Sequence, residues 1–232
     1  MSFQKSNTPK FPLLEMLENP IVLQWKEIVH SIKQSATSTI ITQPRIVLCD
    51  ARNLSFKLEP NRYTCVITSP PYPNRMSYIR ELRPYMYWLG YLQSGREAGE
   101  LDWKAIGGTW GCATSNVGKW APEYDFKIPY ENFYTIIDQI SQISDLLARY
   151  VHKYFYDIVL HSQELYKVVQ HGGFIHYIVG NSKFYDVMLP VESIFASIFQ
   201  DVGFININIQ TIRKRTSKKE LFEFLVSAQK PW

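Results

Sequence analysis

The sequence predicts an α/β fold with a mostly parallel sheet and a terminal antiparallel hairpin. Apolar runs of strand length alternate with segments of helical periodicity along most of the chain, a pattern typical of parallel strands joined by crossover helices. The last two strand-like runs, residues 203–212 and 221–228, are separated by a short basic stretch. We therefore expect these two strands to pair as a hairpin, with a reversed strand at one side of the sheet.

The first elements are a helix and two strands. Residues 1–20 are polar and interrupted by prolines, which indicates a loose arm, and apolar residues at helical spacing predict an amphipathic helix from Pro20. RIVLCD at 45–50 is expected to form a buried strand that ends on Asp50. YTCVIT at 63–68 is the next strand, which two prolines close because proline cannot continue a strand ladder.

The middle and end of the chain continue the alternation. Residues 76–92 predict a helix in which Pro84 introduces a kink, and residues 93–129 form the least regular part. Helical periodicity over 130–169 fits one helix or two. The remaining elements are a strand at 174–179, opened by two glycines and closed by Gly180-Asn181-Ser182, a helix at 189–202, and the terminal hairpin.

Length and composition predict a single domain without metal or membrane segments. We expect residues 1–44 to form an N-terminal arm and helix, and residues 45–232 to form the domain, with an irregular insertion at about 93–129. The net charge of +4 permits binding to nucleic acid. Cys49, Cys65 and Cys112 have no metal-site spacing, and no apolar run reaches membrane length, which favours a cytoplasmic protein.

Three polar residues directly follow predicted strands. Asp50, Ser69 and Asn181 all lie at strand ends. In an open α/β sheet the ligand binds beyond the carboxyl ends of the strands. These residues are therefore candidates for one functional edge.

The segment Thr68-Ser69-Pro70-Pro71-Tyr72 resembles a known catalytic motif. With the preceding strand it is similar to the motif of the amino-methylating DNA methyltransferases of bacterial restriction–modification systems. In that family the Ser-Pro-Pro-Tyr form is associated mainly with cytosine-N4 methylation, and Asp-Pro-Pro-Tyr with adenine-N6. CDARNL at 49–54 resembles the family's G-D-A-x-x-L segment, with Cys in place of Gly. Weaker similarities extend the resemblance over about residues 45–232.

The resemblance implies a Rossmann-like sheet, the catalytic half of an S-adenosylmethionine-dependent methyltransferase that acts on double-stranded DNA. Ser69 and the Pro70 carbonyl would accept hydrogen bonds from the target amine, and Pro71 would stiffen the loop, so that the acceptors are in place before the substrate arrives. Tyr72 would stack on a base extruded from the duplex.

The resemblance also suggests binding residues around this motif. Asp50, Ser69 and Asn181 are the candidates for cofactor contact. Arginine presents a rigid fork of donors that suits phosphate. The candidates for DNA contact are Arg75, Arg80, Arg213 and Arg215.

One part of the family pattern is missing. These enzymes bind the cofactor through a Gly-rich turn, commonly F-x-G-x-G, and no segment of this sequence matches it in the right context. Either a second polypeptide supplies the cofactor-binding half, or the chain is a degenerate relative that cannot methylate alone. Three functions therefore remain open: a cytosine-N4 methyltransferase, first in order, an adenine-N6 methyltransferase, and a non-catalytic DNA-binding or assembly subunit.

Overall fold

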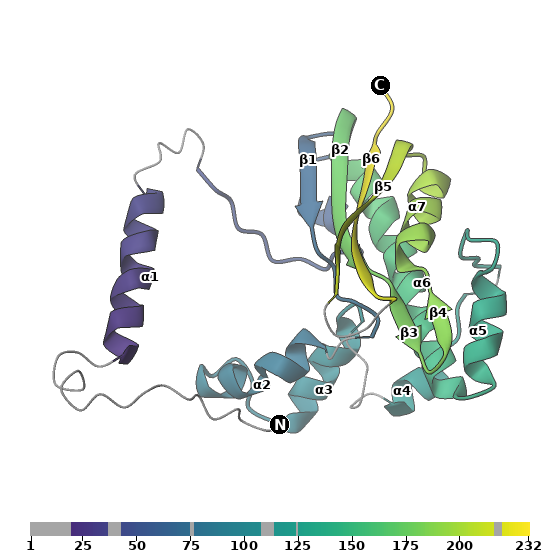
Figure 1. Cartoon of the computed structure of the whole chain (residues 1–232), viewed down its shortest axis with the longest axis horizontal. Helices are drawn as coiled ribbons and strands as arrows, with labels where there is room; N and C mark the ends of the chain where they lie inside the picture. The colour runs from purple at the N-terminus through teal and green to yellow at the C-terminus, as the bar shows by residue number, and fades with distance from the viewer. Residues whose placement is uncertain (1–19, 37–42, 75–76, 108–113, 124, 216–219) are drawn as a thin grey trace. The chain divides into compact units, whose positions relative to one another are not determined.

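The computed structural model describes residues 20–36, 43–74, 77–107, 114–123, 125–215 and 220–232 (Figure 1). The chain divides into two compact units, Met1–Val47 and Leu48–Trp232. The first unit contains α1 (Pro20–Ala36), as its apolar periodicity predicts. Apolar side chains of α1, among them Trp25 and Ile32, are exposed. The predicted arm lies, but for Pro20, outside the described residues.

The second unit is built on a mixed sheet. In the described part of the chain its four strands stand in the order β1-β2-β6-β5. β1 is parallel to β2, whereas β6 runs antiparallel to both of its neighbours. The strands are β1 (Tyr63–Thr68), β2 (Val169–Gly180), β5 (Ile205–Lys214) and β6 (Phe222–Gln229).

The expected position of the reversed strand was wrong. β6 lies inside the sheet between β2 and β5, so the sheet has one parallel pair and two antiparallel pairs in the described residues. Val226 and Ala228 of β6 are buried, while most residues of β5 are exposed. A largely polar strand suits the sheet edge, which leaves the more apolar strand of the hairpin to pair with β2.

Two helices cover one face of the sheet. α6 (Asp145–Val168) and α7 (Val191–Val202) both contact the strands. The alternate residues Ile175, Tyr177 and Val179 of β2 are fully buried. The helical stretch 130–169 proves to be two helices, α5 (Phe133–Ser141) and α6. Ser144 separates them, since its side chain accepts a hydrogen bond from the Leu147 amide and caps α6.

The predicted strand at 45–50 was wrong. These residues have no strand pairing, and Ile46 and Leu48 are 97% and 94% exposed. A strand needs a neighbour for its backbone N–H and C=O groups. In the part of the chain that the structure describes, no strand pairs with this segment, so residues 45–50 form no strand despite their composition.

The stretch 93–129 is more regular than expected. It contains α3 (Gly95–Lys104) and α4 (Thr114–Lys119). Two glycines in α3 lower its intrinsic helix propensity and conceal it. The capping pair Ser94 and Glu97 was the available signal, because the Ser94 side chain accepts from the Glu97 amide.

The remaining elements are short or agree with expectation. α2 (Tyr78–Trp88) contains Pro84. A 3-10 turn η1 (Leu54–Phe56) follows Asn53, and a small hairpin of β3 (Ser182–Phe184) and β4 (Val187–Leu189) follows β2. In the described residues, none of the helices has the length and apolar character needed to cross a membrane.

Candidate functional site

The Ser-Pro-Pro-Tyr loop lies at the carboxyl end of β1, next to the carboxyl end of β2. The parallel register pairs Thr68 with Tyr177, and the Ser69 hydroxyl donates a hydrogen bond to the Ile178 carbonyl at 3.1 Å. The Pro70 carbonyl accepts no hydrogen bond from any residue that the structure describes. The loop is therefore attached to the sheet, with one backbone acceptor left available.

Two aromatic residues of α6 hold the second proline of the loop. The buried Tyr154 hydroxyl donates to the Pro71 carbonyl at 2.7 Å, and Tyr150 donates to the Gly107 carbonyl at 3.1 Å. Gly107 has a φ of +68°, and a Cβ there would lie 3.4 Å from Pro71 Cβ and 3.3 Å from the Tyr154 ring. Burial raises the pKa of Tyr154, which keeps it a donor. The loop therefore lies close to both Tyr154 and Gly107.

Tyr72 is half-buried and its ring is in close contact with two residues. A Cβ on Gly180 would lie 3.0 Å from Tyr72 Cε2. The Arg215 guanidinium carbon is 5.6 Å from the centroid of the same ring, within cation–π range. Burial is the main cause that raises the pKa of Tyr72. The ring therefore has a defined position, set by the end of β2 and by Arg215.

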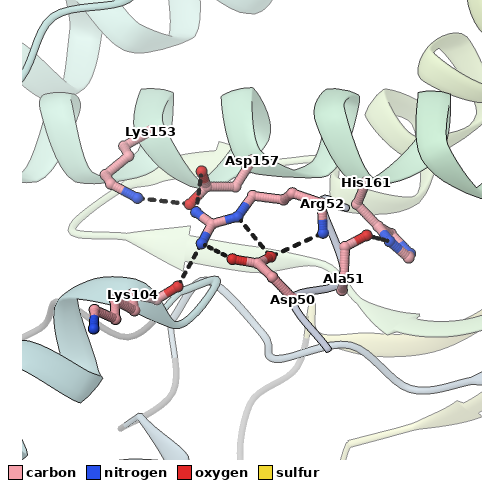
Figure 2. A network of polar contacts seen from close by, with 7 residues as sticks. All are labelled: Asp50, Ala51, Arg52, Lys104, Lys153, Asp157 and His161. Carbon is pink, nitrogen blue, oxygen red and sulfur yellow. Dashed lines mark hydrogen bonds and ion pairs between the residues drawn. The ribbon is translucent and has the colours of Figure 1, made fainter. Parts of the chain in front are cut away.

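Asp50 belongs to a network of charges at the start of the second unit (Figure 2). The Arg52 guanidinium donates to both Asp50 oxygens, at 3.0 and 2.7 Å, and to Asp157 Oδ1 at 2.9 Å. Lys153 donates to the other Asp157 oxygen at 2.6 Å. The hydrogen bond from Arg52 lowers the pKa of Asp50 below its ordinary value. Asp50 is thus ionised at neutral pH.

His161 fixes the residue after Asp50. One ring nitrogen is 2.8 Å from the Ala51 carbonyl and the other is 2.6 Å from the Tyr177 hydroxyl. Because a carbonyl only accepts, Nδ1 carries the proton, and Nε2 accepts from Tyr177. Burial lowers the pKa of His161, which favours this neutral form.

A cavity of about 540 Å³ joins the two predicted segments. Asp50 and Pro71 both line it, and most of the remaining lining is apolar, including Ile79, Leu101 and Ile106. We call it the Asp50 cavity. Its size falls in the range of small-molecule sites, which are mostly apolar with a few polar groups.

The other predicted residues lie around this cavity or away from it. Ser69 and Tyr72 belong to the same loop as Pro71 but do not line the cavity. The Asn181 side chain is buried and joins β2 to β6, accepting from the Phe222 amide at 2.8 Å and donating to the Glu220 carbonyl at 3.0 Å. Its amide is therefore already engaged by the protein.

The predicted DNA-binding arginines differ in their surroundings. Arg80 is exposed on α2. Arg213 is exposed and pairs with Glu223 at 2.5 Å, whereas Arg215 lies over Tyr72. Arg75 lies outside the described residues. Within the described ranges no group of three His, Cys, Asp or Glu side chains could hold a metal ion.

The sequence analysis missed the residues that support the site. They are Arg52, Lys153, Tyr154, Asp157 and His161. One signal was available: Lys153 and Asp157 stand one turn apart in a helical stretch whose neighbouring residues are apolar. Two charges at such positions indicate a buried ion pair.

Comparison with known proteins gives a similar sequence and solved structures whose overall similarity is low. The chain is 23% identical over 217 residues to the type II methyltransferase M.BsoBI of Geobacillus stearothermophilus, which covers 84% of this chain and 41% of that protein. A second match is a solved structure from Thermus thermophilus, which is assigned as a DNA modification methylase. The alignment covers 79% of this chain and 52% of the Thermus chain, with 15% identity and a TM-score of 0.41.

The same Thermus protein in complex with S-adenosyl-L-methionine has a TM-score of 0.38 and 14% identity over 79% of this chain and 54% of that one. No family model matches the sequence. The chain spans less than half the length of M.BsoBI. It is thus an α/β protein with a mixed sheet, similar in sequence over most of its length to part of a DNA methyltransferase.

Proposed function

We propose that this chain is the catalytic part of a DNA methyltransferase that transfers a methyl group from S-adenosylmethionine to the exocyclic amine of cytosine, at N4. The observation that carries the proposal is the Asp50 cavity, which Asp50 and Pro71 line together at the carboxyl end of β1. Adenine N6 is the second candidate. A Ser-Pro-Pro-Tyr loop and the sequence similarity to M.BsoBI support both.

The loop would position and activate the target amine. Its lone pair is delocalised into the base, so two hydrogen-bond acceptors facing the N–H groups draw the nitrogen toward a nucleophilic state. The Ser69 oxygen and the Pro70 carbonyl are proposed as these acceptors. Tyr154 holds the next carbonyl, at Pro71, so the loop needs little rearrangement during the reaction.

Tyr72 would contact the target base with its ring. Gly180 and Arg215 already fix that ring, so a base would meet an aromatic surface of defined orientation. Arg215, with Arg75, Arg80 and Arg213, is proposed to contact the DNA backbone. Arg80 and Arg213 are exposed, as phosphate contact requires.

The residues of the Asp50 cavity fit the chemistry of the cofactor. Apolar walls suit an adenine ring, and the ionised Asp50 carboxylate suits hydroxyl or amino donors. Asp50 is the proposed cofactor contact within the cavity. Ser69 and Asn181 do not line it, so they are proposed to contribute from the ends of β1 and β2, where Asn181 holds the chain in place. The cofactor supplies an electrophilic methyl group. The protein residues bind it and align it with the amine.

We further propose that a second polypeptide completes the site with a Gly-rich cofactor turn. β1 pairs only with β2 among the described strands, so its other edge has unpaired backbone groups. Side chains beside this edge are apolar and exposed: Ile67 is 74% exposed and Phe174, across from Cys65, is 46% exposed. A β-strand added beside β1 would satisfy the edge. Ile67 and Phe174 alternate with the buried residues and so lie on the sheet face opposite α6 and α7, where another part of the same polypeptide would cover them.

Methyl transfer tests the proposal. The chain, alone and together with a candidate polypeptide that carries a Gly-rich turn, is incubated with unmethylated DNA and tritiated S-adenosylmethionine. We expect incorporation into DNA that Ser69→Ala and Tyr72→Ala each reduce by about 100-fold or more. Arg96→Ala, which removes an exposed ion pair on α3, is the control. An active complex that tolerates both loop substitutions would contradict the catalytic role.

Association tests the second polypeptide separately. Ile67→Glu places a charge on the exposed face of β1 and should abolish complex formation in sedimentation analysis. Ile143→Glu, which changes an exposed isoleucine between α5 and α6, should leave it intact. Equal binding by the two variants would place the interface elsewhere.

A further inference from the structure

We infer that Arg52 is a positioning residue that holds the two walls of the Asp50 cavity together on a buried carboxylate of α6. The inference rests on the proposed function, because it names a residue that the cofactor site needs without contact to the cofactor. The Arg52 side chain is mostly buried, and Arg52 is not among the residues that line the cavity.

Arg52 binds the first wall, residues 48–51, through Asp50. Its Nε and Nη2 donate to the two Asp50 oxygens at 3.0 and 2.7 Å, and its backbone amide donates to Oδ1 at 2.9 Å. These three bonds fix the carboxylate on the chain that carries it. The direction in which Asp50 faces the cavity therefore depends on Arg52.

The same guanidinium binds the second wall, residues 104–106 at the end of α3. Nη2 also donates to the Lys104 carbonyl at 2.6 Å, and Lys104, Ala105 and Ile106 line the cavity. This carbonyl belongs to the last turn of α3, where backbone acceptors lack partners within the helix. One planar side chain thus connects two segments that lie 52 residues apart in sequence (Figure 2).

The third contact anchors both walls to the core. Nη1 donates to Asp157 on α6 at 2.9 Å, and the Asp157 side chain is 4% exposed. Bonds in three directions require the fork of a guanidinium, which an ammonium group cannot reproduce. Arginine at this position is therefore specific in geometry as well as in charge.

Lys153 provides a matched control, which separates the positioning role of Arg52 from its contribution to protein stability. Lys153 donates to the second Asp157 oxygen at 2.6 Å and lies 4.8 Å from the Trp103 ring centroid. If Arg52 is replaced, Asp157 keeps a positive partner, so no buried charge is left uncompensated. If Lys153 is replaced, Asp157 keeps Arg52 and both cavity walls stay connected. The two residues share one carboxylate, but Arg52 alone reaches the walls through the bonds described.

The experiment compares Arg52→Met with the matched variant Lys153→Met and with Arg52→Lys, each in the full chain with its cofactor-turn partner. Binding of S-adenosylhomocysteine is measured by calorimetry, and melting temperature by differential scanning fluorimetry. Hydrogen–deuterium exchange follows peptides covering 48–57 and 101–107. Both methionine variants should lower the melting temperature.

We expect Arg52→Met alone to weaken binding, on the order of tenfold, and to speed exchange in both peptides. Arg52→Lys should recover the melting temperature in part and the affinity little. Equal affinity losses in the two methionine variants, or unchanged binding in Arg52→Met, would overturn the inference. If the wild-type complex binds no S-adenosylhomocysteine, the proposed cofactor site is wrong. Faster exchange at both walls in Arg52→Met alone would then still support the positioning role, and unchanged exchange would reject it.

Discussion

At the scale of single residues, the site depends on contacts that fix the position of the loop carbonyls and of the Tyr72 ring. Tyr154 holds Pro71, His161 holds Ala51, and Gly180 leaves room for the Tyr72 ring. None of these three supporting residues belongs to the motif itself. The motif supplies the groups proposed for the reaction, and residues far along the chain place them.

Gly180→Ala tests the placement of Tyr72. The new methyl group would lie 3.0 Å from Tyr72 Cε2 and 3.3 Å from Arg215 Nη1, so the ring and the guanidinium must both shift. We expect methyl transfer to fall about tenfold or more, with a smaller loss of stability. Gly99→Ala in α3 is the control, since nothing lies within 4 Å of its added methyl. Full activity in Gly180→Ala would show that the ring position is unimportant.

Two partly buried histidines, His152 and His161, predict a dependence of stability on pH. Burial lowers the pKa of His161 and of His152 in the folded protein. Below about pH 6.5 the unfolded chain binds protons that the folded protein does not, so stability present at neutral pH is lost as the pH falls.

We expect the free energy of unfolding to decrease between pH 7 and 5, by at most about 1.4 kcal/mol per pH unit for each histidine. Urea titrations at several pH values measure the slope. His161→Asn should reduce this slope, because it removes one of the two groups whose pKa the fold lowers. An unchanged slope in His161→Asn would contradict the neutral assignment.

At the scale of elements, the end of α6 has an unusual cap. The Lys230 ammonium, from the residue after β6, donates to the Tyr166 and Val169 carbonyls at 2.6 and 2.9 Å and to Asn61 Oδ1 at 2.7 Å. A cation at the C-terminus of a helix interacts favourably with the helix dipole. The residue thus ties the last strand to α6 and to the turn before β1.

Lys230→Met should therefore lower the free energy of unfolding by about 2–4 kcal/mol, because the buried acceptors lose a charged donor while the aliphatic stem is kept. Chemical denaturation measures the change. Lys167→Met, which removes an exposed ion pair with Glu164 near the same helix end, should cost less than about 1 kcal/mol. Similar losses in the two variants would mean that the cap contributes little.

Elements with strong local signals were predictable from the sequence. YTCVIT with its two prolines marked β1, and the spacing of apolar residues marked α1 and α7. RIVLCD had the same kind of signal and still forms no strand, because strand formation depends on a neighbour that the local sequence does not specify. The order of β6 and β5 in the sheet likewise depends on the pairing of β6 with β2, which lies far from it in sequence.

The candidate site was predictable only in part. Asp50 and the Ser-Pro-Pro-Tyr loop could be singled out because their residue types follow strands. Asp157 and His161 could not be connected to them, since their contacts with Arg52 and Ala51 span more than 100 residues along the chain. Long-range contacts of this kind have no periodicity that a sequence pattern can reveal.

At the scale of the whole molecule, the sheet that the structure describes has one face covered by helices and an unpaired edge at β1. α6 and α7 pack on one side, whereas Ile67 and Phe174 are exposed beside β1. The relative M.BsoBI has more than half of its length outside the region of similarity. A partner that continues the sheet and brings the cofactor turn would account for both observations.

The most direct test of the central claim is the identity of the methylated base. DNA treated with the reconstituted complex and S-adenosylmethionine is digested to nucleosides and examined by mass spectrometry. The account predicts N4-methylcytosine from the wild-type chain and none from Ser69→Ala. Detection of N6-methyladenine instead would replace the cytosine-N4 assignment by the second candidate, adenine N6. No methylated base from a complex that binds both DNA and cofactor would contradict the account and favour a non-catalytic subunit.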